Sequence, residues 1–486
     1  MYFNYKIIIK IVGMIAIIIG IAMIPSLILA FYYGEKEAVA AFIKSILLAI
    51  SIGIIIRLSV FPTTSQIKIR DGFLIAAISW FVASALGAFP FLFSGVSQSY
   101  LDAFFESVSG FTTTGTTIIN NYQEIPKAVI FWRSLSHWLG AMGILVLAIS
   151  LLPALGIGGL MIARVESPGP TVEKTKARIS DSAKMLYWVY ITFTLIEVTL
   201  LKMGGLSYFD AFTHTFTSIS TGGTLIYANG IQHFNSIYVE IVISLFHIIA
   251  SINFVLFYKL FKGKWKEFIK DYELRTFIAI LSVATVLISF NLWFSNSYED
   301  LASSIRHAFF QSASFISTAG NATSDFTMWP SFSQMILLCL MLIGGCSVST
   351  AGSMKVIRIM IVFKLIVRGM YKRLHPNAVV GVKIGTKVIH SEIVSKVSSF
   401  TILYFTVLVF SSILLSLENH DLLTTISAVA STMSNTGIGL GVIGHDGNFR
   451  IFSEASRLYL SFLMIAGRLE LFAVIMLLSP SFWKAE

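Results

Sequence analysis

Long apolar segments separated by short polar ones run through the whole chain. After the first two apolar segments, the other eight pair up, and each pair encloses a stretch too polar and too short to cross a bilayer, which needs about 20 apolar residues. The pattern predicts an all-α polytopic membrane protein. Its expected spans lie near residues 7–32, 39–57, 72–97, 128–153, 185–203, 234–258, 276–294, 333–366, 397–417 and 455–480.

The four enclosed polar stretches align with one another without gaps. They read DAFFESVSGFTTTG (102–115), DAFTHTFTSISTGG (210–223), HAFFQSASFISTAG (307–320) and TTISAVASTMSNTG (424–437). A repeat of this kind identifies the architectural unit. We therefore expect four pseudo-symmetric membrane–pore-loop–membrane repeats around a central pore, preceded by two extra N-terminal transmembrane helices. The expected units are residues 1–71, 72–160, 161–265, 266–380 and 381–486.

Composition and charge agree with this topology. The chain is 56% hydrophobic and 12% charged, with a mean hydropathy of +0.80 and a formal net charge of +10. Basic residues concentrate in segments 163–178, 259–270 and 354–373. Loops rich in Lys and Arg stay cytoplasmic, so a cytoplasmic N-terminus puts these three segments inside and all four polar stretches on the opposite side. We attribute the positive charge to topology and to anionic membrane lipid, and expect no nucleic-acid partner.

Each polar stretch has the composition of a re-entrant loop. It opens with residues that fit one face of a short helix and then changes to Ser, Thr and Gly. Irregular backbone at membrane depth is tolerated only where protein covers it or where it lines a watery cavity. A helix C-terminus carries partial negative charge, and the extended backbone that follows can present carbonyl oxygens to a dehydrated cation. Glycine permits the positive φ that such a strand needs. The stretches therefore predict a cation pore.

At this point the chain resembles the Trk/Ktr/HKT superfamily of potassium transporters over residues 72–483, most specifically in FTTTGTT, ISTAG, SNTGIGLG, GGCSVSTAGSMKVIR and AGRLELF. Its length and two leading spans are similar to the TrkH-type pore subunit. The resemblance implies potassium uptake across the cytoplasmic (inner) membrane, with K⁺ bound in a selectivity filter. The filter residues it implies are Thr113, Thr114, Gly115, Thr221, Gly222, Gly223, Thr318, Ala319, Gly320, Asn435, Thr436 and Gly437.

Two points about this filter follow from the resemblance and the alignment. In the second loop the ungapped alignment favours Gly223 as the filter glycine, and a slip by one residue to Gly222 stays open. In plant members, serine at the first filter glycine accompanies sodium preference, whereas glycine in all four loops accompanies potassium. All four are glycine here, so we expect potassium, with a sodium-selective or sodium-coupled transporter as the alternative.

Two further segments are expected to gate the pore. Arg468 lies mid-way along the last apolar segment, where a charge normally faces a pore or a partner. In the family it projects into the pore, and the alternative is an ion pair with Glu470 or Glu197. Segment 344–355, GGCSVSTAGSMK, interrupts a hydrophobic region too long for one span. It resembles the family's intramembrane gating loop, and the alternative is a kinked helix with small packing residues. The expected loop residues are Gly344, Gly345, Ser349, Thr350, Gly352 and Lys355.

The resemblance also implies partners. It predicts a homodimer docked on a separate cytosolic, nucleotide-binding regulatory ring (TrkA-like), with Lys355–Arg373 as the lever between ring and loop. We expect no nucleotide on this chain, because GLGVIG at 439–444 lacks the strand and helix of a dinucleotide fold.

Other signals are weaker. His137, His214, His247 and His307 lack metal-ligand spacing, so we expect interfacial or hydrogen-bonded roles. Glu106 and Asp102 either attract cations to the pore mouth or stabilise helix N-termini, and for Asp102 we favour the helix cap. The sequence shows no Ser/His/Asp arrangement or phosphate loop, so we expect no enzyme. A membrane-embedded lipid-modifying enzyme is the alternative from another class.

Overall fold

The structure is a computed structural model that describes residues 3–60, 69–119, 124–143, 177–223, 226–227, 230–385, 387–444 and 447–484. In these residues the fold is almost entirely helical. The expected boundary between repeats 1 and 2, the end of the span predicted at 128–153, and most of the basic segment 163–178 lie outside them.

Three helices form the N-terminal unit: α1 (Tyr5–Ala22), α2 (Ile24–Tyr32), which has a proline in its first turn, and α3 (Lys36–Ser59). Helices α1 and α3 touch through small residues. A Cβ added to Gly53 would lie closer than 3.0 Å to the Gly13 carbonyl oxygen, a separation that real Cβ atoms essentially never show. Glycine at this contact lets the two backbones approach closely, as membrane helices commonly do.

The rest of the chain repeats one motif of a long helix, a short buried helix and a returning helix. The elements of repeat 1 are α4 (Ile69–Gly87), α5 (Phe89–Phe93), α6 (Tyr100–Phe111) and α7 (Lys127–Ala141), and those of repeat 2 are α10 (Ala177–Met203), α11 (Tyr208–Ile219), η3 (Gly230–Phe234), α12 (Ile237–Ser251), α13 (Phe254–Phe261) and α14 (Trp265–Ile269). Repeat 3 has α15 (Tyr272–Phe294), α16 (Leu301–Ile316), η4 (Phe326–Met328), α17 (Ser331–Ile343) and α18 (Val356–Leu374), followed by the antiparallel pair β1 (Lys383–Ile384) and β2 (Lys387–Val388). Repeat 4 has α19 (Ser391–Leu415), η5 (Ser416–Glu418), α20 (Leu422–Ser434), η6 (Gly441–Ile443), α21 (Glu454–Arg468), α22 (Phe472–Leu478) and α23 (Pro480–Trp483).

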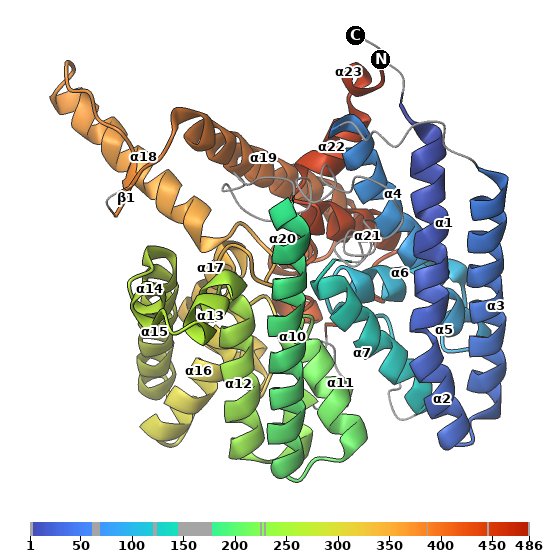
Figure 1. Ribbon diagram of the computed structural model, residues 1–486. Helices are drawn as coiled ribbons and strands as arrows, with labels where there is room; N and C mark the ends of the chain where they lie inside the picture. The colour runs from blue at the N-terminus through green and yellow to red at the C-terminus, as the bar shows by residue number, and fades with distance from the viewer. Residues whose placement is uncertain are drawn as a thin grey trace.

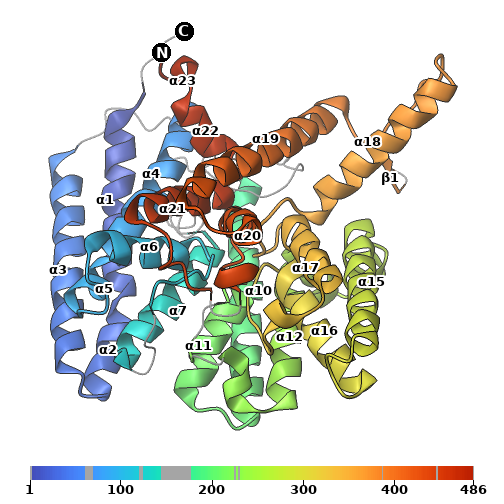
Figure 2. The same cartoon turned by 180° about the vertical axis from the view of Figure 1, so that it is seen from behind.

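The four repeats surround a common centre. In Figure 1, repeats 1, 2 and 3 run from right to left in blue-cyan, green and yellow. In the opposite view, α20 and α21 of repeat 4 face the viewer (Figure 2). Helix α18 projects away from the body in both views.

Six of the described helical segments are long and apolar enough to cross a membrane: Tyr5–Tyr32, Lys36–Ser59, Arg70–Phe93, Lys184–Met203, Tyr272–Phe294 and Ser391–Glu418. A seventh is counted if α12 and α13, bent by 98° at their junction, form one span. Three of the spans expected from hydropathy are interrupted among the described residues. The 333–366 segment breaks between α17 and α18, as expected. The 234–258 segment bends between α12 and α13, and the 455–480 segment breaks after Arg468; neither of these interruptions was predicted.

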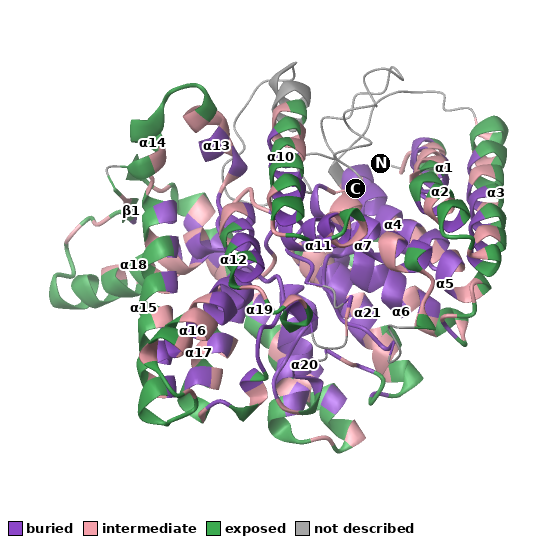
Figure 3. Ribbon diagram, turned by 90° about the horizontal axis from the view of Figure 1, so that it is seen from below, coloured by how far each residue is buried: buried purple, intermediate pink, exposed green. Residues whose placement is uncertain are grey.

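Burial in this protein differs from that in a soluble one in two ways, although many apolar side chains are also buried. Large apolar side chains such as Leu47, Phe290 and Phe410 are exposed on the outer faces of α3, α15 and α19, whereas many Ser and Thr side chains are buried in the centre. Buried residues gather around α7, α11, α20 and α21 (Figure 3). An apolar exterior and a polar interior are what a lipid-embedded protein with a central polar path requires.

Candidate ion-conduction site

Four short helices, α6, α11, α16 and α20, carry the polar stretches. Each begins at a side-chain cap, because Ser99, Ser207, Asp300 and Asp421 accept a hydrogen bond from the backbone N–H three residues further on. The helices therefore start with satisfied N–H groups, and their C-terminal ends carry the glycine-ended strands. The prediction that Asp102 caps its helix was wrong, because Ser99 is the cap and the Asp102 carboxylate forms a 2.6 Å ion pair with Arg457.

The four strands share one backbone conformation. The residue two positions before each closing glycine has positive φ: Thr113 at 54°, Thr221 at 54°, Thr318 at 58° and Asn435 at 56°. The closing glycines also have positive φ, at 91° for Gly115, 49° for Gly223, 69° for Gly320 and 88° for Gly437. A non-glycine residue with positive φ is uncommon, so four of them at equivalent positions indicate a specific strand shape rather than an ordinary turn.

The same hydrogen bond fixes all four strands to their helices. The backbone N–H just before each glycine donates to the carbonyl oxygen five residues earlier. These bonds are Thr114 to Ser109 (2.9 Å), Gly222 to Thr217 (2.8 Å), Ala319 to Ser314 (2.9 Å) and Thr436 to Ser431 (2.9 Å). Orphan carbonyls at each helix end are thus satisfied within the loop.

The strands meet edge to edge and close a ring. A Cβ added to each glycine would lie closer than 3.0 Å to a carbonyl oxygen of the next repeat: Gly115 against Gly222, Gly223 against Ala319, Gly320 against Thr436, and Gly437 against Thr114. Each glycine thus faces the residue that precedes the glycine of its neighbour, in the order 1–2–3–4–1. Gly223 and not Gly222 has the equivalent position and the positive φ, whereas Gly222 packs against the His137 ring.

The residues predicted for the filter are therefore brought together, and side chains behind the ring hold it. The Thr112 and Thr114 hydroxyls are 2.7 Å apart, as are those of Ser434 and Thr436. The Asn435 amide links two repeats by donating to Thr114 Oγ1 at 2.9 Å.

Arg468, the last residue of α21, lies against the side of this ring at which the strands leave their helices, which is called the inner side below. Its guanidinium donates to Thr113 Oγ1 (3.0 Å), to the Thr350 carbonyl (3.0 Å), and to the last two carbonyls of α7, Gly140 (3.2 Å) and Ala141 (2.8 Å). The two carboxylates weighed as alternative partners are engaged elsewhere. Glu470 pairs with Arg358 at 2.5 Å, and Glu197 accepts a hydrogen bond from Ser218.

Segment 344–355 forms a loop that lies against the end of α11 in repeat 2, the strand of repeat 3 and the end of α20 in repeat 4. Gly352 N–H donates to Thr318 Oγ1 of repeat 3 at 2.7 Å, and its Cα faces the Ser434 carbonyl of repeat 4. Thr350 Oγ1 donates to the Ile219 carbonyl at the end of α11 (3.2 Å), and the Thr350 carbonyl accepts from Arg468, which in turn reaches repeat 1. The loop lies across the inner face of the ring.

A cavity of about 120 Å³ lies beside this loop, lined by Arg468, Lys355, Asn435 and residues 348–353, among others. Lys355 is buried and has positive φ, and its side-chain nitrogen donates to the Ala351 carbonyl. The Arg468 guanidinium borders the same space on the inner side of the ring. Its charge opposes the entry of a cation.

Sequence reasoning missed the residue that anchors the loop. Glu273, in the first turn of α15, accepts hydrogen bonds from the Ser347 N–H and hydroxyl (both 2.6 Å) and from the Ile357 N–H (3.3 Å). It therefore ties both ends of the loop to one carboxylate. An acidic residue at the start of a membrane helix was the available signal, because such a group needs a partner.

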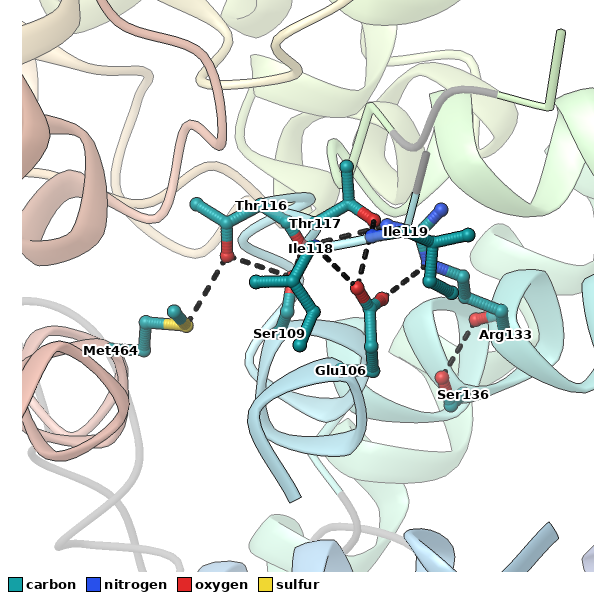
Figure 4. A network of polar contacts seen from close by, with 9 residues as sticks. All are labelled: Glu106, Ser109, Thr116, Thr117, Ile118, Ile119, Arg133, Ser136 and Met464. Carbon is teal, nitrogen blue, oxygen red and sulfur yellow. Dashed lines mark hydrogen bonds and ion pairs between the residues drawn. The ribbon is translucent and has the colours of Figure 1, made fainter. Parts of the chain in front are cut away.

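Glu106 serves neither of the two purposes considered for it. It is fully buried behind the first strand, where it pairs with Arg133 (Figure 4). The histidines are hydrogen-bonded or packed: His247 Nε2 lies 3.0 Å from the Asn321 amide, and His307 Nδ1 lies 3.3 Å from Thr323 Oγ1. The partner of His247, Asn321, is buried next to Gly320, the closing glycine of repeat 3.

Six membrane-length helical segments among the described residues, four short helices that carry the polar stretches, and a closed ring of glycine strands define a polytopic membrane protein of the pore-loop class. The chain belongs to the TrkH family of cation transport proteins, whose family model matches residues 38–485. The Trk system potassium uptake protein TrkH of Salmonella typhimurium is 35% identical over 99% of this chain and 100% of its own length. The protein of the same description from Halomonas elongata is 33% identical, with the same coverage.

A solved structure agrees with these relatives. The crystal structure of the potassium transporter TrkH from Vibrio parahaemolyticus matches with a TM-score of 0.89 and 33% identity, covering 99% of this chain and 100% of that one. The family resemblance and the predicted fold class are therefore confirmed. The match is to transport proteins, so the lipid-modifying enzyme is not supported.

Proposed function

We propose that this chain is the pore-forming subunit of a potassium uptake system. One observation carries the proposal: four equivalent strands close a ring in which each glycine meets a backbone carbonyl of the next repeat. Several relatives over the full length are named Trk system potassium uptake proteins, which supports potassium as the transported ion.

The ring would bind the ion through backbone oxygens. Carbonyl groups from Thr113, Thr221, Thr318 and Asn435 onward replace the hydration shell of K⁺, and no carboxylate is needed because the C-termini of α6, α11, α16 and α20 supply partial negative charge. The positive φ at two positions in each strand turns successive carbonyls toward the axis. A site made of backbone carbonyls and helix termini releases the ion readily, because its partial charges hold the ion less tightly than a carboxylate would.

The loop 344–355 and Arg468 would close the pore on its inner side. Three observations support this role: the loop hydrogen-bonds to repeats 2 and 3, Arg468 hydrogen-bonds to repeat 1 and to the loop, and the Arg468 guanidinium is positively charged. Opening requires the loop to leave Thr318 and the Arg468 guanidinium to move away from Thr113. A partner can drive that movement only by binding the open arrangement with a different affinity from the closed one.

The regulator would act from the cytoplasm. We place the protein in the cytoplasmic (inner) membrane, in contact with membrane lipid and with its N-terminus in the cytoplasm. We propose that it forms a homodimer that docks on a separate nucleotide-binding ring. The projecting helix α18, which follows the loop directly and carries Lys372 and Arg373 in its last turn, supports this arrangement (Figure 1). Lys259 of α13 and Lys266 of α14 belong to the basic segment 259–270, which the positive-inside rule keeps in the cytoplasm.

A flux assay tests the proposal. Purified protein in proteoliposomes is compared for K⁺, Rb⁺, Na⁺ and Li⁺ flux, with and without a pH gradient. We expect K⁺ and Rb⁺ to exceed Na⁺ and Li⁺. Equal flux of all four ions, or Na⁺ in excess, would contradict a potassium filter, and a dependence on the pH gradient would indicate ion-coupled uptake rather than conduction.

A second assay tests the partner. The chain alone should conduct without response to nucleotide, and the cognate cytosolic ring should make flux nucleotide-sensitive. Nucleotide control of the chain alone would refute both the separate ring and the α18 lever.

A further inference from the structure

One position of the pore helices differs sharply between repeats that are otherwise alike. Nine residues before each closing glycine stand Glu106, His214, Gln311 and Ala428, and all four are buried. Of the four, Glu106 and Gln311 form hydrogen bonds with the residues that follow the closing glycine of their repeat. Repeat 1 therefore has a carboxylate where the others have an imidazole, an amide and a methyl group.

The Glu106 carboxylate holds two consecutive residues of the strand that leaves the ring. Its Oε1 accepts hydrogen bonds from the Thr117 hydroxyl and from the Ile118 N–H, both at 2.7 Å (Figure 4). Its Oε2 lies 3.0 Å from Arg133 Nε. Both side chains are nearly inaccessible, at 0% and 5% relative exposure, so the charges are stabilised by each other and by these donors rather than by water.

Arg133 extends the support to the residue beside the filter glycine. Its Nη2 donates to the Thr116 carbonyl at 3.4 Å, and the same carbonyl accepts from the Ser109 hydroxyl at 2.7 Å. The Thr116 carbonyl is thus directed at the pore helix. One ion pair fixes three successive residues directly after Gly115.

Repeat 3 uses the same plan without charge. Ser314 and Gln311 both donate to the Asn321 carbonyl, at 2.6 Å and 3.2 Å, so the residue after Gly320 is held as Thr116 is held after Gly115. The ion pair is therefore a stronger version of a support that recurs in the ring. Charge-assisted hydrogen bonds are about twice as strong as neutral ones.

We infer that Glu106 and Arg133 are positioning residues that fix the first filter strand and thereby set the discrimination between K⁺ and Na⁺. Neither touches the ion, and both act through Thr116 and Thr117. The inference rests on the proposed function. Loss of the pair frees the outer end of the Gly115 strand, and the ring adapts more easily to the smaller Na⁺ ion.

The test is a pair of neutral double variants. Glu106→Gln/Arg133→Gln removes both charges and leaves no unpaired buried ion. The matched control is Glu240→Gln/Arg306→Gln, because Glu240 and Arg306 form a bidentate pair (2.6 and 2.7 Å) between α12 and α16 whose hydrogen bonds join the two side chains to each other. Thr117→Val is a milder third variant that keeps both charges. It removes the hydroxyl that donates to Glu106 (2.7 Å) and accepts from the Ile119 N–H (3.1 Å).

The permeability ratio of Na⁺ to K⁺, from reversal potentials in proteoliposomes, is measured beside thermal unfolding. The Glu106/Arg133 double variant should raise the ratio about threefold to tenfold and Thr117→Val about twofold, the scale of one or two misplaced hydrogen bonds. The control should lower thermal stability and leave the ratio unchanged.

If the Glu106–Arg133 ion pair had only a structural role, its loss would lower thermal stability and leave the Na⁺ to K⁺ permeability ratio unchanged. A wild-type ratio in the Glu106/Arg133 double variant would therefore overturn the inference, and if that variant fails to fold, a wild-type ratio in Thr117→Val would do so. A wild-type protein with no preference for K⁺ would refute the proposed function, and the inference with it, before any variant is compared.

Discussion

Replacing Gly115 with serine tests the ring most directly. Gly115 has φ of 91°, and an added Cβ would press on the Gly222 carbonyl oxygen of the next repeat, closer than 3.0 Å. Gly205, in the turn after α10, also has φ of 91°, but an added Cβ would meet nothing within 4 Å. The two substitutions share the backbone strain and differ only in the contact across the ring.

The expected magnitudes follow from this difference. The left-handed conformation costs a non-glycine residue about 1–2 kcal/mol, so both variants should lose about that much stability. Only Gly115→Ser forces strands 1 and 2 apart, by on the order of 1 Å, because non-bonded carbon contacts are optimal at about 3.5–4.0 Å. A carbonyl displaced by that distance coordinates K⁺ poorly. We expect the preference for K⁺ over Na⁺ to fall about tenfold, which corresponds to about 1.4 kcal/mol.

The assay is competition of K⁺ and Na⁺ for flux in proteoliposomes, with thermal unfolding measured on the same preparations. Gly205→Ser should be destabilised and keep wild-type selectivity. If folded Gly115→Ser kept wild-type selectivity as well, Gly115 would not line the filter, and the ring would have to be assigned another role.

Three further predictions concern the inner gate. Arg468→Ala should raise K⁺ flux at least about tenfold, because a unit charge at about 8 Å repels a cation by about 2 kcal/mol when the effective dielectric constant is about 20. Unchanged or abolished flux in the folded variant would show that the arginine has a purely structural role. Gly352→Ala puts a methyl group against the Ser434 carbonyl, so it should displace the loop and raise basal flux, whereas Gly34→Ala, with nothing within 4 Å, should not. Glu273→Gln replaces an acceptor oxygen with a donor and should raise basal flux while lowering the free energy of unfolding by about 1–3 kcal/mol. Wild-type flux with lowered stability would show that Glu273 anchors the fold and not the gate.

The sequence alone determined the membrane class, the repeat and the position of the re-entrant stretches. These features depend on local properties. A run of apolar residues must be helical in lipid, and a stretch such as 307–320 that begins with helix-forming residues and ends in Ser, Thr and Gly can be recognised without knowing its neighbours. The interruption at 344–355 was predicted for the same reason, because small and polar residues weaken a membrane helix wherever it lies.

Only the tertiary structure decided how these pieces meet. The alignment favoured Gly223, but its contact with Ala319 of the next repeat could not be predicted from it. The support of Thr116 by Arg133 likewise joins two separate segments, so no local pattern encodes either contact. The Asp102 carboxylate, in the first turn of α6, pairs with Arg457, which is distant in the sequence. The last span breaks after Arg468, where Glu470 and Leu471 have positive φ and Glu470 pairs with Arg358. Hydropathy reports the solvent that each segment prefers, whereas these features arise from hydrogen bonds and ion pairs between segments far apart in the chain.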